Sequence, residues 1–172
     1  MVGPPASGVE TLAGLLAAHP ELRVFPADAR VIERVAPSAV PDAYRRLAEA
    51  AGVPRGVRWV DPEPDNLLHA RALLAAFPQA RFLVVTRAQE RAEACLTGRM
   101  GWRQGARRRL AEATAVGLEV AGWPEALLVE DEALRGSAQA TLQRVLRFLG
   151  LGWDGALDEA LTRFAPHLAR RL

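Results

Sequence analysis

The sequence has no lysine, a single cysteine and no long hydrophobic run. Because Cys95 is alone, an intramolecular disulfide is excluded and a cysteine-based zinc site is not expected. No apolar stretch reaches the ~18 residues of a membrane-spanning helix, and the N-terminus lacks the basic flank and apolar run of a signal peptide. We therefore expect a cytoplasmic protein with no metal site and no membrane contact.

The absence of lysine means that all 22 basic residues are arginines. Any anion held by a side-chain cation must be held by arginine, and lysine-dependent catalysis is excluded. Arginines gather in "GRMGWRQGARRRL", where Arg107, Arg108 and Arg109 are consecutive. Consecutive residues fan around a helix and do not share one face, so we expect a solvated helix and no nucleic-acid contact.

Short apolar runs alternate with longer helical patterns along the 172 residues, half of which are apolar. The runs typical of buried parallel strands are "LRVFP" at 22–26, "GVRWVDP" at 56–62, "RFLVVTR" at 81–87 and "ALLVED" at 126–131. Helices are expected at 8–19, 41–52, 65–78, 103–120 and 137–151, the last with Ser137 as its cap. This alternation predicts one α/β domain over 1–172, with helices flanking a mainly parallel sheet in three layers.

The chain opens with "MVGPPASGVETLAGLLAAHP", a glycine turn that runs into a helix. Such a turn binds phosphate through backbone N–H groups and the helix dipole. Only Met1 and Val2 precede the turn, so the first strand is expected to be short or missing. The motif GxxxxGK[ST] is absent, which argues against ATP or GTP hydrolysis by that route.

Four blocks of the sequence resemble, in order, the motifs of sulfotransferases that use 3′-phosphoadenosine 5′-phosphosulfate (PAPS). "GPPASGVETLAGLLAAHP" resembles GxPRSGTTLLxxLLxxHP, and "WVDPEPDNLLHARALLAAFPQA" resembles DKTPxNLxxxxxLxxxFPxA. "RFLVVTRAQERAEAC" is similar to RFIxxxRDPRDxxxS, and "LLVEDEAL…ATLQRVLRFLGL" to YEDL…TLxxxLxFLGL. The segment "HPELRVFPADARVI" is closest to the bacterial and tyrosylprotein-sulfotransferase-like branch.

The resemblance implies a P-loop-like fold and transfer of a sulfuryl group from PAPS, as co-substrate, to a hydroxyl or amine acceptor. In the family the first loop holds the 5′-phosphosulfate, which assigns Ser7, Gly8, Val9 and Glu10 to the donor site. The family's basic residue is replaced here by Ala6, and its two hydroxyl residues by Val9 and Glu10. The loop is thus a degenerate 5′ site, reduced to Ser7 and backbone amides.

The second motif implies that Arg87 and Cys95 hold the 3′-phosphate, with Cys95 in place of the family's serine. The lysine of the DKTP-like block is replaced by Pro62, and Arg30 is a candidate replacement cation. The catalytic base of the related branch corresponds to Asp28 after a one-residue shift; it would deprotonate the acceptor.

Each assignment has a structural alternative. Ser7 and Gly8 form a helix cap and turn in that interpretation, Arg87 a structural ion pair, Cys95 a core residue and Asp28 a solvated loop residue. An inactive member of the fold that binds a partner is accordingly the alternative function. A small kinase-like enzyme of another P-loop class is least favoured.

Overall fold

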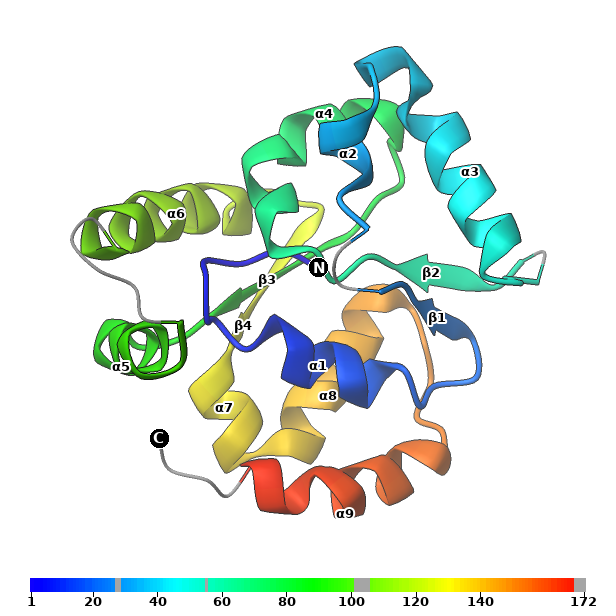
Figure 1. Ribbon diagram of the computed structural model, residues 1–172. Helices are drawn as coiled ribbons and strands as arrows, with labels where there is room; N and C mark the ends of the chain where they lie inside the picture. The colour runs from blue at the N-terminus through cyan, green and yellow to red at the C-terminus, as the bar shows by residue number, and fades with distance from the viewer. Residues whose placement is uncertain (27–28, 55, 101–105, 169–172) are drawn as a thin grey trace.

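The computed structural model describes residues 1–26, 29–54, 56–100 and 106–168 (Figure 1). Strand β1 (Leu22–Val24) pairs in parallel with β2 (Arg58–Val60). Strand β3 (Phe82–Thr86) pairs in parallel with β4 (Ala126–Glu130). The four predicted strands and their parallel direction are confirmed. They form two pairs, however, where one continuous sheet was expected.

Val2 links the β3–β4 pair to the start of the chain. It forms a parallel bridge with Val84, in which Val2 N–H donates to Leu83 O at 3.0 Å and Val85 N–H donates to Val2 O at 2.9 Å. This single bridge stands at the position of the short first strand that the sequence predicts. The glycine turn follows it directly.

A groove separates β2 from β3 beside this bridge. Its volume is about 1000 Å³, and its lining includes Trp59 of β2 and Phe82 and Leu83 of β3. At one end of the groove the Met1 ammonium donates a hydrogen bond to the backbone oxygen of Asp61, just after β2. Met1 and Val2 therefore lie between the two strand pairs, in contact with both.

Side chains of β3 alternate between two hydrophobic cores, as expected of a strand that is buried on both faces. Leu83 and Val85 pack in one core, together with helix α1 (Val9–Leu16). Phe82 and Val84 pack in the other. Helices α1, α7 (Asp131–Gly136), α8 (Ala138–Leu149) and α9 (Ala156–Leu168) lie on one side of β3 and β4 (Figure 1).

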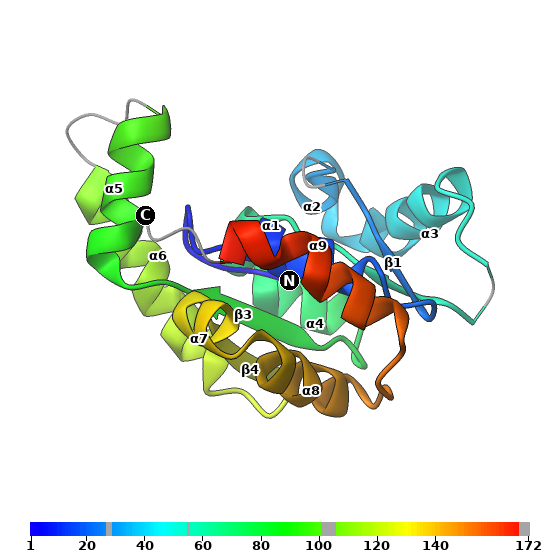
Figure 2. The ribbon, with the colours of Figure 1, turned by 90° about the horizontal axis from the view of Figure 1, so that it is seen from below.

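The opposite side is covered by α3 (Val40–Ala50), α4 (Ala70–Ala76) and α6 (Ala106–Ala121) (Figure 1). The short elements α2 (Val31–Arg34) and η1 (Pro37–Ala39) precede α3. Helix α5 (Gln89–Met100) follows β3 and packs on α6 at one end of the molecule (Figure 2). The layered α/β architecture predicted from the sequence is confirmed.

Two expected helices differ from the prediction. The 65–78 segment is divided into a 3₁₀ helix, η2 (Pro64–His69), and the α-helix α4, and the Glu63 carboxylate accepts from the N–H of Asp65 at the start of η2. Ser137 does occupy the N-cap of α8, but its side chain makes no capping hydrogen bond. Its backbone oxygen accepts from Thr141 N–H at 2.9 Å. Across the described ranges, no helix is long and apolar enough to cross a membrane.

Candidate functional site

The carboxyl ends of the parallel strands meet at one edge, where α/β folds bind ligands. The loop 3–8 follows the Val2 bridge, and Arg87 follows β3. Glu63 comes three residues after β2, and Asp131 directly follows β4. Because these strands run in the same direction, four segments far apart in the sequence reach the same edge (Figure 1).

The opening loop is closely packed and partly left-handed. Ser7 N–H donates to Pro4 O at 3.1 Å, and Gly8 adopts φ 96° as the N-cap of α1. Ala6 has φ 61°, a conformation that non-glycine residues adopt mostly at constrained sites. A methyl group on Gly3 would lie 2.4 Å from Ser7 Oγ, so the loop requires glycine there.

A cavity of about 320 Å³ opens between this loop and helices α5 and α6. Ser7 and Arg87, two of the polar residues that the sequence predicts at the donor site, both line it, as does Gln89. Its other walls are mainly apolar: Pro4, Pro5, Ala92, Leu110, Ala111, Thr114, Ala115 and Leu118. Ser7 is buried, and within the described ranges its Oγ has no hydrogen-bond partner. A buried hydroxyl without a partner at a cavity wall is suited to a polar ligand group.

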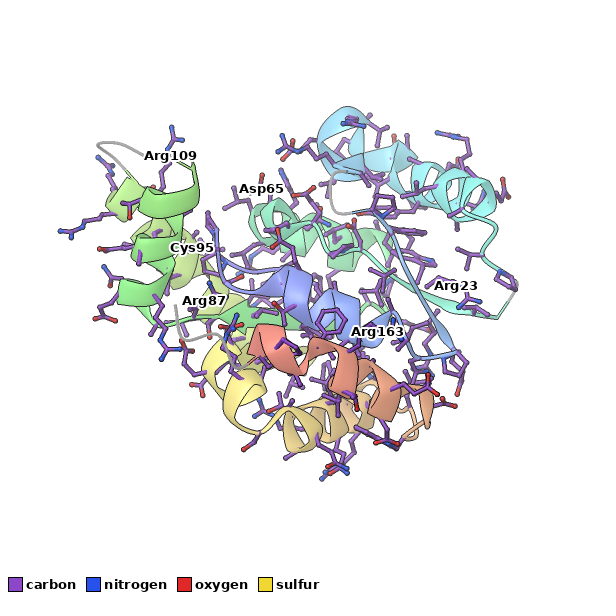
Figure 3. All side chains as sticks on the ribbon, turned by 60° about the horizontal axis from the view of Figure 1, so that its bottom comes forward. Arg23, Asp65, Arg87, Cys95, Arg109 and Arg163 are labelled. Atoms are coloured by element: carbon purple, nitrogen blue, oxygen red, sulfur yellow. The ribbon has the colours of Figure 1, made fainter. Side chains whose placement is uncertain are left out.

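Arg87 makes a buried ion pair, which was the structural alternative for this residue. Its Nε donates to Asp131 Oδ2 at 3.0 Å, and the two side chains are only 6% and 1% exposed. Nε of Arg135, from α7, reaches the same oxygen at 2.6 Å. Arg87 (Figure 3) is therefore an ion-pair partner that also lines the cavity, and its binding of an anion stays a prediction.

The remaining predicted donor-site residues lie around this centre and not within it. Val9 is buried in the core beneath α1, and Glu10 is exposed on the first turn of that helix. Cys95 is a half-buried free thiol on α5, and it does not line the cavity although its helix does (Figure 3). Asp28, the predicted catalytic base, lies outside the described residues.

Ala6, at the position of the family's basic residue, packs against an apolar cluster formed by Ala92, Leu96 and Leu110 of α5 and α6. The wall of the loop that faces these helices is therefore apolar over the residues that the structure describes. The guanidinium of Arg87 lies beside the loop, where its Nη2 would be 3.3 Å from a methyl group on Gly8.

A buried polar cluster at the end of β2 was not predicted. Tyr44 Oη and Asn66 Nδ2 donate to Asp61 Oδ2 at 2.5 and 2.8 Å, and Glu63 N–H donates to Asp61 Oδ1 at 3.0 Å. Glu63 Oε2 and Asn66 Oδ1 are buried and have no hydrogen-bond partner in the part of the chain that the structure describes. The signal that could have indicated this cluster is "DPEPDN", which places three carboxylates at a strand end.

Burial raises the pKa of the Glu63 carboxyl above its usual range, and the Asp65 and Asp61 carboxylates act in the same direction. The hydrogen bond from the backbone of Asp65 and the Arg30 guanidinium oppose this shift. Arg30, the proposed replacement cation, therefore interacts with Glu63 at the β2 end of the edge. Within the described ranges, no three His, Cys, Asp or Glu side chains are grouped as a metal site would require.

Comparison with known proteins gives a family and a fold. None of the curated proteins compared matches the sequence. The chain is similar to the crystal structure of a sulfotransferase from Alicyclobacillus acidocaldarius, with 18% identity and a TM-score of 0.63 over 98% of this chain and 90% of that one. Residues 39–155 match the model of the sulfotransferase family, a span that includes β2, β3, β4 and Arg87 and begins after the opening loop. The chain belongs to the sulfotransferase family.

Proposed function

We propose that this protein binds PAPS in the cavity beside the opening loop and transfers its sulfuryl group to a hydroxyl or amine acceptor. The observation that carries the proposal is the shared position of Ser7 and Arg87. Both line one cavity at the carboxyl edge of the strands, and the Ser7 hydroxyl has no hydrogen-bond partner among the described residues.

The apolar walls of the cavity and its polar end suit the two ends of a nucleotide. Leu110, Ala111 and Leu118 offer surface to a flat ring, whereas Ser7 and Arg87 offer donors to anionic oxygens. Backbone N–H groups at the first turn of α1 add donors that need no side chain. The Ser7 hydroxyl and these backbone amides are the donors that remain in the degenerate loop.

In the proposed reaction the acceptor oxygen or nitrogen attacks the sulfur of PAPS. The bond between this sulfur and the 5′-phosphate oxygen breaks, and adenosine 3′,5′-bisphosphate leaves. The acceptor loses one proton, which we assign to Asp28 as base. The loop donors stabilise the negative charge that develops on the leaving 5′-phosphate, and Arg87 binds the 3′-phosphate and so helps to hold the nucleotide in line.

The charge of Glu10 does not oppose this proposal strongly. The residue is exposed on α1, so water and salt screen its repulsion of a bound anion. Glu10 and Val9 contribute through their backbone positions at the helix N-terminus, and Cys95 contributes at most a weak donor from α5.

A partner-binding protein without donor activity is the second candidate. It is favoured by Ala6, which leaves the loop without a cation, and by Asp131, which already binds Nε of Arg87. In that case the cavity would bind neither PAPS nor adenosine 3′,5′-bisphosphate, and the protein would bind its partner through another surface.

The test is transfer of labelled sulfate from PAPS to a panel of phenols, alcohols and amines. We expect turnover in the unmodified chain, a loss of about tenfold or more in Ser7→Ala and a larger loss in Arg87→Gln. Arg45→Gln is the matched control, because it removes an exposed ion pair with Asp42 from α3. Turnover that is absent, or equal in all variants, contradicts the proposal.

A further inference from the structure

The acidic segment after β4 contacts the turn that leaves β3 at two points. Asp131 Oδ2 accepts from Arg87 Nε at 3.0 Å, and Glu132 Oε1 accepts from the N–H of Ala88 at 3.1 Å. One carboxylate therefore binds the Arg87 side chain while the next binds the backbone beside it. Together they fix both the position of the turn and the direction of the guanidinium.

The bond to Nε determines which part of Arg87 can meet a ligand. A guanidinium has five N–H donors in a planar fork, and Nε carries only one of them. Because Nε donates to Asp131, the two Nη groups remain as donors for a ligand. Nη2 lies next to Gly8, and the Arg87 side chain lines the cavity. Asp131 thus leaves the forked end of Arg87 for a ligand in the cavity.

Arg135 compensates the charge of Asp131. The Asp131 side chain is 1% exposed, and its Oδ2 receives a guanidinium from each side, at 3.0 Å from Arg87 and 2.6 Å from Arg135. The charge of Asp131 is therefore shared between two guanidiniums. Asp131 can orient Arg87 while Arg135 takes part of the carboxylate charge, so the attraction of Arg87 for an anion is not fully cancelled.

We propose that Asp131 is a positioning residue that aims Arg87 at the 3′-phosphate of the nucleotide and so sets the preference for nucleotides that carry this group. This inference rests on the proposed function. If the ion pair only stabilised the fold, its loss would change the affinities for all nucleotides by the same factor. A positioning role, by contrast, acts on the one ligand group that Arg87 contacts.

The test compares the affinities of two ligands for the same folded samples. Adenosine 3′,5′-bisphosphate and adenosine 5′-monophosphate are titrated into the unmodified chain, Asp131→Asn and Asp131→Ala. We expect the unmodified chain to prefer the bisphosphate. The preference should fall about fivefold in Asp131→Asn, which keeps one acceptor oxygen, and by about tenfold or more in Asp131→Ala. Asp42→Asn, at the exposed pair on α3, is the control and should leave the preference unchanged.

The ratio of the two affinities is insensitive to a loss of stability, because both ligands meet the same protein. Should Asp131→Ala not fold, the isosteric Asp131→Asn still decides the question. A strong preference in the unmodified chain that stays the same or rises in Asp131→Asn overturns the positioning role and leaves the proposed function intact. Failure of the unmodified chain to bind either nucleotide overturns both.

Discussion

The Asp131 carboxylate occupies the space that a side chain on Gly8 would need. A methyl group added to Gly8 would be 2.4 Å from Asp131 Oδ1, which is shorter than any real contact of a Cβ atom. Gly8 also has φ 96°, which an L side chain rarely adopts. The first residue of the loop–helix junction and the acidic residue after β4 therefore constrain each other, so the ion pair with Arg87 is part of the loop's structure.

The substitution Gly8→Ala should lower the free energy of unfolding by about 3 kcal/mol, since the positive φ costs roughly 1–2 kcal/mol and a buried carboxylate must also move. Gly56→Ala is the matched control, because Gly56 has φ 84° with nothing within 4 Å of an added methyl. Chemical denaturation should show a loss of only about 1 kcal/mol for the control. Equal losses in the two variants would show that Asp131 does not crowd Gly8.

Restoring a charge at Ala6 should strengthen nucleotide binding. Ala6 lies in the loop between the cavity and the apolar cluster of α5 and α6, and the loop has no cationic side chain. Ala6→Arg should raise the affinity for adenosine 3′,5′-bisphosphate by about fivefold, as a partly exposed charge pair is worth roughly 1 kcal/mol. Ala6→Gln, of similar length but uncharged, should bind like the unmodified chain. An equal gain from glutamine would assign the effect to packing.

Tyr44, the only tyrosine, should ionise only when the protein unfolds. Its burial and the nearby Asp61 carboxylate raise the pKa of its phenol well above 10. Because the folded pKa lies above the unfolded one, this group's stabilisation is complete below about pH 10 and is lost as the pH rises further. Tyrosinate absorbance should therefore appear together with loss of circular dichroism. Tyrosinate forming near pH 10 in a folded chain would contradict the cluster.

The groove between β2 and β3 should be visible in amide hydrogen exchange. Alternation in a parallel strand directs Leu83 N–H toward the groove, whereas Phe82 N–H donates to Glu125 O at 2.8 Å and Val85 N–H to Val2 O at 2.9 Å. The Leu83 amide should exchange at least tenfold faster than the amides of Phe82 and Val85 in NMR measurements. Equal protection of the three amides would mean that the groove is closed in solution.

Much of the fold could be predicted from the sequence because its signals are local. Each strand is a short apolar run that ends in polar residues, and the helices 8–19 and 41–52 begin and end at clear signals. The bounds of helix α5 were not predicted, since "QERAEACLTGRM" has little amphipathic pattern, and helix α9 was not predicted. The division into two strand pairs also could not be predicted, because it depends on how the strands meet in space.

At the site, Ser7 and Arg87, which the sequence assigns to the donor site, line one cavity. Their binding of a donor stays a prediction. The sequence could not indicate Asp131. In "VEDEAL" three acidic residues are adjacent, and only the start of α7 directly after β4 decides that Asp131 is buried while Glu130 is exposed. Glu63 was missed for a similar reason, since its burial depends on the packing of η2.

The central claim is that Ser7 and Arg87 form a working nucleotide site. It is tested most directly by calorimetric titration of adenosine 3′,5′-bisphosphate into the unmodified chain and Arg87→Ala. We predict binding in the micromolar range that weakens by a factor of about 100 or more in the variant, as expected when a charged hydrogen-bond donor is lost. No binding at millimolar nucleotide, or equal binding by both proteins, would contradict the account.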